Sequence, residues 1–147
     1  MKKFVFPLAR VMEWRRTQVR IEEVKLERLH SELHSMEERE RALASEVSQA
    51  RQAVTRAVSV TGFELSALDR YQKAVAATLL KWAGERAELS PRIAAQVDIV
   101  ALRRRDLRLL ERLRDQRLAD WHAAFDRETE QQAQESFLAK WNVRPHR

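Results

Sequence analysis

Apolar side chains recur at alternating steps of three and four residues over the first part of the chain, from Leu8 to Ala57. This spacing keeps a narrow apolar stripe on one face of a helix, as at the a and d positions of a coiled coil. Polar residues interrupt the stripe at Arg15, Glu22 and Glu40. The pattern predicts one long helix over about residues 8–58, roughly 75 Å in length.

A second stripe with the same spacing runs from Leu65 to Leu110 and predicts a second helix over about residues 64–141. Its polar positions are Gln72, Arg86, Gln96 and Arg103. A turn of about residues 59–63 separates the two stripes, and so short a connection joins antiparallel neighbours. We therefore expect an all-α fold, a long antiparallel two-helix coiled-coil hairpin that forms a single domain over residues 1–147.

The sequence Thr61-Gly62-Phe63-Glu64 has the spacing of a capping box at the start of the second helix. In this motif the Thr61 hydroxyl accepts a hydrogen bond from the Glu64 backbone amide, and the Glu64 carboxylate accepts one from the Thr61 amide. Gly62 could instead be a left-handed residue that ends the first helix. Both alternatives put the turn in the same place.

Ser90-Pro91 lies inside the second predicted helix, where the pair is a helix-start signal and a proline costs about 3 kcal/mol. The three-four spacing nevertheless passes from Leu89 to Ile93 without losing a residue. This continuity favours a kink or a collinear break over a reversal of the chain. The alternative is a three-helix bundle whose third helix runs parallel to the first.

The hairpin geometry leaves the C-terminal part of the second helix without a partner. With the turn near residue 62, residue i of the first helix lies opposite a residue near 124 − i, so positions beyond about 120 extend past the first helix. The three-four spacing of apolar residues also shifts there. Continued without change, the stripe would place Arg114 and Arg117 on the apolar face, and a four-residue insertion in the repeat produces such a shift. The new frame holds Leu118, Trp121 and Phe125, and Phe137, Leu138 and Trp141 follow without intramolecular cover.

The first eleven residues form a lead-in that places Phe4, Phe6 and Leu8 at every other position around Pro7. A coiled coil does not explain this alternation, which is typical of a docking segment. A second apolar line then follows the first third of the helix, and two packed helices cannot bury both lines. The second line consists of Val11, Trp14, Ile21 and Val24. Either the C-terminal overhang folds back onto it, or an external partner covers it.

Two groups of apolar residues are therefore candidate partner-binding surfaces. The first, which we call the open end, comprises Phe4, Phe6, Val11, Trp14, Trp121 and Phe125. The second, near the turn, comprises Phe63, Leu68 and Tyr71. A hairpin with two separate apolar ends is typical of a connector between partners.

Composition adds a preference for acidic partners. The 147 residues include 28 Lys and Arg against 22 Asp and Glu, a net charge of +6, and no cysteine. The absence of cysteine excludes disulfides and thiolate metal sites and fits a reducing compartment such as the cytoplasm. The apolar stretch before Arg10 is too short for a cleavable leader, and no stretch has the length to span a bilayer. We expect a cytoplasmic protein.

The run from Arg103 to Arg117 is the strongest argument for nucleic-acid binding. Acidic residues are interleaved with its arginines and follow it: Asp106, Glu111, Asp115 and Asp120. Pairs such as Glu111 with Arg114, or Arg117 with Asp120, predict a salt-bridged solvent face. Because a surface that tracks phosphates carries mostly one sign of charge, we expect an acidic protein partner and no nucleic acid.

No catalytic, cofactor-binding or metal site is predicted. His30 and His34 stand four residues apart, as zinc ligands on a helix do, but Glu32 between them gives His-x-Glu-x-His and no third ligand is evident. The sequence has no glycine-rich phosphate loop and no serine or histidine in a nucleophile setting. We expect a protein that is not an enzyme and takes no cofactor or small-molecule substrate.

Two stretches carry a family resemblance. At the N-terminus, Phe4-x-Phe6-x-Leu8-x-Arg10-Val11-Met12 leads into a long helix rich in arginine and glutamate. Toward the C-terminus, the sequence Leu110-Glu111-Arg112-Leu113-Arg114-Asp115-Gln116-Arg117 is followed by Trp121 and by Arg127-Glu128. Together they resemble the flagellar export protein FliJ family. The chain departs from the family at Ser90-Pro91 and in the weakly acidic end Gln131-Gln132-Ala133-Gln134-Glu135.

The resemblance implies a stalk-like, non-enzymatic coiled coil similar to the rotary ATPase gamma subunit. Such proteins belong to the flagellar type III export apparatus at the cytoplasmic side of the inner membrane and are needed for flagellum assembly and motility. They bind the export ATPase and its regulator, engage the cytoplasmic region of the export gate and escort export chaperones. The alternatives are a YscO-like stalk protein of injectisome type III secretion, or a structural or nucleic-acid-associated coiled coil outside secretion.

Overall fold

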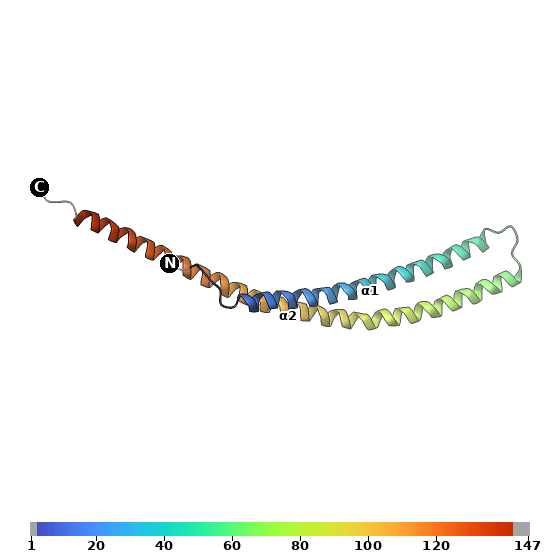
Figure 1. The fold of residues 1–147 in the computed structure, drawn as a ribbon. Helices are drawn as coiled ribbons and strands as arrows, with labels where there is room; N and C mark the ends of the chain where they lie inside the picture. Colours follow the sequence, from blue (N-terminus) through green and yellow to red (C-terminus); the bar gives the residue numbers. More distant parts are fainter. Residues whose placement is uncertain (1–2, 143–147) are drawn as a thin grey trace. The chain divides into compact units, whose positions relative to one another are not determined.

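The computed structural model describes residues 3–142, which form two long helices. Helix α1 spans Ala9–Thr55 and helix α2 spans Gly62–Asn142, and the described residues contain no strand. Figure 1 shows the two helices running side by side in opposite directions. The predicted all-α hairpin of two antiparallel helices is confirmed. Helix α1 ends three residues earlier than the sequence predicts, and α2 begins two residues earlier.

The packing divides the hairpin into two compact units. The end unit contains Met1–Val19 and Leu102–Arg147, and the turn unit contains Arg20–Ala101. Each unit combines a stretch of α1 with the antiparallel stretch of α2 that packs against it. In the end unit Arg15 pairs with Asp106, and in the turn unit Arg39 pairs with Glu85. These pairings follow the predicted rule that residue i lies opposite a residue near 124 − i.

The core follows the predicted three-four stripes. Its buried apolar residues on the helices are Met12 and Val19 in the end unit and Val75, Leu89 and Val100 in the turn unit. All of them are stripe positions. The stripe residues between Leu26 and Val54 are half-buried, because two helices meet along one face only and leave the other faces to solvent. Leu89 is the most enclosed, with 2% of its surface exposed.

Polar residues on the two stripes pair with one another across the turn unit. Glu22 and Gln96 are both buried, and the Gln96 amide donates to Glu22 Oε2 at 2.7 Å and to the Glu22 backbone oxygen at 3.0 Å. Farther toward the turn, Arg86 Nη1 donates to Glu40 Oε2 at 3.0 Å. Because a polar group in an apolar seam is satisfied in one register only, these pairs specify how α1 and α2 align.

The capping box is confirmed. The Thr61 amide donates to Glu64 Oε2 at 2.8 Å, and the Glu64 amide donates to the Thr61 hydroxyl at 3.2 Å. Helix α2 accordingly begins at Gly62, and no glycine of the chain has a positive φ. The alternative in which Gly62 is a left-handed residue that ends the first helix is therefore wrong.

The capping box predicts an acid-dependent loss of stability. Hydrogen bonds from the Thr61 amide and hydroxyl lower the pKa of Glu64 below its ordinary value of 4.5. A carboxylate whose pKa is lower in the folded state contributes stability that is present above the unfolded pKa and disappears as the pH falls through the folded pKa. We expect thermal melts to show part of the stability lost below about pH 4.5, and Glu64→Gln to reduce that pH dependence. An unchanged pH profile in Glu64→Gln would contradict the role given to this carboxylate.

Pro91 lies within α2, and the helix continues through it. Leu89 is buried and Ile93 is half-buried, so the apolar stripe packs against α1 on both sides of the proline. Pro91 and Ala87 are both exposed, so the hydrogen bond that the proline cannot donate to the Ala87 carbonyl is lost on the solvent side of α2. Of the kink or collinear break predicted at Ser90-Pro91, the break is absent, because packing on both sides of the proline offsets its local cost. The described residues form two helices and not three, so the three-helix alternative is wrong.

The overhang does not fold back. Helix α2 is uninterrupted to Asn142, and the side chains from Thr129 to Trp141 are all exposed. A return onto α1 would require a break in α2 after Trp121, which the sequence does not supply because no glycine or proline lies between Trp121 and Asn142. The alternative in which the C-terminal overhang covers the second apolar line is therefore wrong.

Candidate partner-binding end

The end unit holds the part of α2 that has no α1 residue opposite it. Helix α1 begins at Ala9, whereas α2 runs to Asn142. By the pairing rule Ala9 lies opposite a residue near 115, so α2 extends roughly 40 Å beyond α1, and the part past Trp121, residues 122–142, is roughly 30 Å long. We call residues 122–142 the overhang.

The lead-in packs onto α2 where the overhang begins. The ring of Phe4 lies 6.1 Å from that of Trp121, and the two are tilted against each other. Leu113 and Arg117 of α2 line a groove together with the lead-in residues 3–8. The Ala9 amide donates to the Phe6 carbonyl at 3.2 Å, which turns the extended lead-in into the first turn of α1. The chain's own N-terminal segment thus covers the first part of the unpaired helix.

Alternation along the lead-in decides which of its side chains the fold uses. Phe6 is buried and Phe4 is half-buried, whereas Val5 between them is exposed. Phe4 and Phe6 therefore face α2, as successive residues of an extended segment point to opposite sides. The structure buries Phe6 as part of the core, so among the predicted open-end residues its side chain is the one least accessible to a partner.

Trp121 is the centre of an aromatic cluster. Its ring stacks on Phe125 at 5.5 Å and meets His122 edge-on at 5.0 Å. Leu118 and Trp121 are half-buried while Arg117 is exposed, which agrees with the predicted shift of the apolar frame. Phe125 remains exposed on the overhang. The structure thus brings Phe4, Trp121 and Phe125 together, as predicted for the open end.

Val11 and Trp14 are exposed on α1 of the same unit, with 53% of the Trp14 surface open to solvent. The Arg15 guanidinium lies 5.1 Å from the centre of the Trp14 ring and donates to Asp106 Oδ2 at 3.3 Å. The second apolar line is thus uncovered in the end unit. In the turn unit its other members also lie outside the core, since Ile21 is exposed and Val24 is half-buried.

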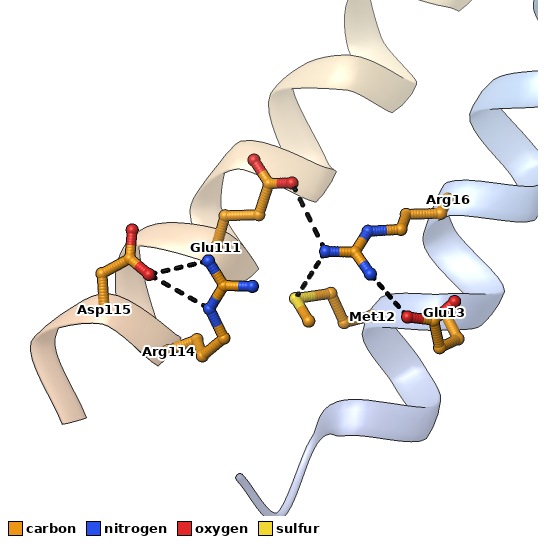
Figure 2. A network of polar contacts seen from close by, with 6 residues as sticks. All are labelled: Met12, Glu13, Arg16, Glu111, Arg114 and Asp115. Atoms are coloured by element: carbon orange, nitrogen blue, oxygen red, sulfur yellow. Dashed lines mark hydrogen bonds and ion pairs between the residues drawn. The ribbon is translucent and has the colours of Figure 1, made fainter. Parts of the chain in front are cut away.

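Ion pairs join the two helices beside this surface. Figure 2 shows Arg16 of α1 between Glu13, to which it donates at 2.5 Å, and Glu111 of α2, 4.0 Å away. Arg114 donates twice to its neighbour Asp115, at 2.8 and 3.1 Å. The sequence predicts Glu111 with Arg114 instead, because spacing along one helix takes no account of a cation on the other. The acids within the arginine run are nonetheless paired, as expected for a mixed solvent face.

The candidate residues near the turn differ in exposure. Phe63 and Tyr71 are exposed, and Leu68 is half-buried on the apolar stripe. His30 and His34 are exposed on α1, and His34 lies 3.9 Å from Glu38. Among residues 3–142 no three His, Cys, Asp or Glu side chains are grouped closely enough to hold a metal ion.

Two exposed leucines of the end unit are missed by sequence reasoning. Leu102 and Leu109 stand seven residues apart on α2, each one residue before a stripe position. Val11 and Trp14 likewise stand one residue before stripe positions of α1. A second apolar line next to the stripe on both helices is therefore the sequence pattern that would have predicted Leu102 and Leu109. They extend the exposed apolar surface from α1 to α2.

No family model, curated protein or solved structure matches this chain. Within residues 3–142, neither helix combines the length and the apolar character needed to cross a membrane.

Proposed function

We propose that this chain is a non-enzymatic component of the bacterial flagellar type III protein export apparatus. In this role it acts as a stalk-like coiled coil that binds the export ATPase ring through its open end. Its other partners are the cytoplasmic region of the export gate and the export chaperones that it escorts. The proposal extends the resemblance of both ends of the sequence to the flagellar export protein FliJ family.

The observation that carries the proposal is the composition of the open end. Phe4 and Trp121 pack together, Phe125 is exposed at the start of the overhang, and Trp14 is exposed on α1 of the same unit. Exposed aromatic side chains grouped beside a helix end favour a protein partner, because aromatic residues supply much of the energy at protein interfaces. A hairpin in which one helix continues past the other fits insertion of that helix into a ring.

The second exposed group supports a connector with two partners. Phe63 and Tyr71 belong to the turn unit, apart in sequence from every open-end residue. In this proposal the turn region meets the export gate or a chaperone while the open end meets the ATPase. A small-molecule substrate, a cofactor and a catalytic step have no part in it.

The proposal predicts that the chain stimulates a purified flagellar export ATPase through its exposed open-end aromatics. We expect the wild-type chain to promote ring assembly and ATP hydrolysis, and Trp14→Ala with Phe125→Ala to weaken the stimulation by at least about tenfold. Both side chains are exposed, so the variant keeps its fold. ATP hydrolysis and light scattering, titrated with each chain, give the comparison.

Phe63→Ala is the control, because it removes an exposed aromatic side chain from the turn unit. It should stimulate the ATPase as the wild-type chain does. Absence of stimulation by the wild-type chain, or equal loss in all variants, would contradict the proposal. Stimulation of an injectisome ATPase but not of the flagellar one would assign the chain to the other secretion system.

A further inference from the structure

The end unit presents an exposed apolar surface formed by both helices. Helix α1 contributes Val11 and Trp14, and α2 contributes Leu102 and Leu109, each between 43% and 56% exposed. We call these four residues the apolar face. Soluble monomers seldom leave grouped large apolar side chains uncovered without a binding role.

One polar bridge shows that the four residues share a side of the hairpin. Asp106 follows Leu102 by four residues and precedes Leu109 by three, so the three side chains lie on one face of α2. Arg15 donates to Asp106 while its guanidinium lies over the Trp14 ring. Trp14 is therefore on the side of α1 that faces Leu102 and Leu109. Val11 is one turn away on that same side.

The overhang carries a second apolar surface near its end. Phe137, Leu138 and Trp141 are each between 59% and 64% exposed, and the rings of Phe137 and Trp141 stack at 6.2 Å. Spacing of three and four residues places all three on one face of the helix. We call them the overhang tip. A stacked aromatic pair held on a helix is rigid and loses little conformational freedom on binding.

The two surfaces have complementary charge at their edges. Basic residues outnumber acidic ones beside the apolar face, since residues 102–117 of α2 hold seven arginines against Asp106, Glu111 and Asp115. Arg10, Arg105 and Arg112 are exposed there, and Arg105 lies 3.8 Å from Asp106. The overhang carries the exposed acids Asp126, Glu130 and Glu135 and the half-buried Glu128, against Arg127 and Lys140. An apolar surface with a basic rim therefore matches an apolar surface on an acidic helix.

These surfaces cannot meet within one chain. Leu109 and Phe137 lie on the same uninterrupted helix, α2, which keeps them roughly 40 Å apart. We propose that they meet between two copies of this chain, in an antiparallel dimer where each overhang tip packs on the partner's apolar face. If Phe137 of one copy lies near Leu109 of the other, the two-fold axis of the dimer crosses α2 near residue 123, midway between them. The symmetric dimer then covers the apolar face and the overhang tip of both copies.

The area is sufficient for a stable dimer. Seven large, half-exposed side chains on each copy would leave water, and each buries on the order of 100 Å². Two copies therefore bury on the order of 1,400 Å², which lies toward the lower end of specific protein interfaces. Since the dimer covers Trp14, it also competes with any other partner of the open end.

The oligomeric state tests the dimer directly. We expect sedimentation equilibrium to give a dimer at tens of micromolar for the wild-type chain. Phe137→Ser with Trp141→Ser, or Leu109→Ser alone, should yield monomers with unchanged helical circular dichroism. Leu80→Ser, a matched loss of an exposed leucine from α2 in the turn unit, should leave the dimer intact. A monomeric wild-type chain, or a dimer that persists in both end-unit variants, overturns the proposal.

Cross-linking tests the antiparallel arrangement. Because the chain has no cysteine, single substitutions report one contact each. We expect Arg112→Cys mixed with Gln134→Cys to form a disulfide-linked dimer under mild oxidation, while neither variant cross-links alone. Cross-linking of Arg112→Cys with itself, or none in the mixture, contradicts the arrangement. The export ATPase takes no part in either experiment, so failure of the proposed function leaves both results unaffected.

Discussion

Leu89→Ala will lower the free energy of unfolding by about 3 kcal/mol, within the range measured for leucine truncations in protein cores. Leu89 has 2% of its surface exposed and lies on the apolar stripe of α2, two residues before Pro91. Removing its side chain leaves a cavity in the seam and withdraws the packing that offsets the proline. Chemical denaturation followed by far-ultraviolet circular dichroism measures the change.

Leu80→Ala is the matched control for this prediction. Leu80 lies on the same helix and in the same unit, but 77% of its surface is exposed. The two substitutions change helix propensity equally, so only burial distinguishes them. Leu80→Ala should change the stability by no more than about 0.5 kcal/mol. Equal effects of the two substitutions would mean that α1 and α2 do not pack along the predicted stripe.

The sequence predicts the core closely because a two-helix hairpin has one interface. With one interface, most residues that recur at three-four spacing are covered by the partner helix, although Leu8 and Leu65 at the ends of the stripes are exposed. Met12, Val19, Val75, Leu89 and Val100 are all such positions, and all are buried. The capping box is equally predictable, because every group that it needs lies within four consecutive residues.

Pro91 shows where local reasoning is insufficient. Its cost is local and can be read from the sequence, whereas the packing that offsets it comes from the apposed residues of α1. Polar pairs between the two helices also depend on residues of the other helix and cannot be predicted from one stripe alone. Glu22 and Gln96 appear from the sequence as separate exceptions to two stripes, and only the alignment of the helices makes them partners.

The candidate site is predictable in part for similar reasons. The pairing rule by itself brings Phe4 near Trp121, and the two rings do lie together. Burial of Phe6 depends on how the non-helical lead-in crosses α2, for which no periodic pattern exists. Leu102 and Leu109 are missed because neither stands out on its own helix. They form a surface only with Val11 and Trp14 of the other helix.

Gln96→Leu will destabilise the hairpin by about 2 kcal/mol although it makes the seam more apolar. The buried Glu22 carboxylate loses the amide that donates to it at 2.7 Å, and a buried charged group that loses a hydrogen-bond donor costs more than the bond contributes. Gln72→Leu is the matched control. Gln72 is a half-buried glutamine on the same stripe and in the same unit, and its replacement should leave the stability unchanged or raise it.

The double variant Glu22→Leu with Gln96→Leu tests whether the Glu22–Gln96 pair stabilises the hairpin or specifies how α1 and α2 align. Replacing both polar partners by apolar residues removes the desolvated charge, so the double variant should recover the loss of Gln96→Leu. Denaturation curves of the wild-type chain and the three variants measure the coupling, and additive losses would contradict it. With Glu22 and Gln96 gone, α1 can shift against α2 at lower cost. Spin labels on cysteines placed at Arg39 and Glu85, whose guanidinium and carboxylate lie 3.5 Å apart in the wild-type chain, should then give a broader distribution of distances.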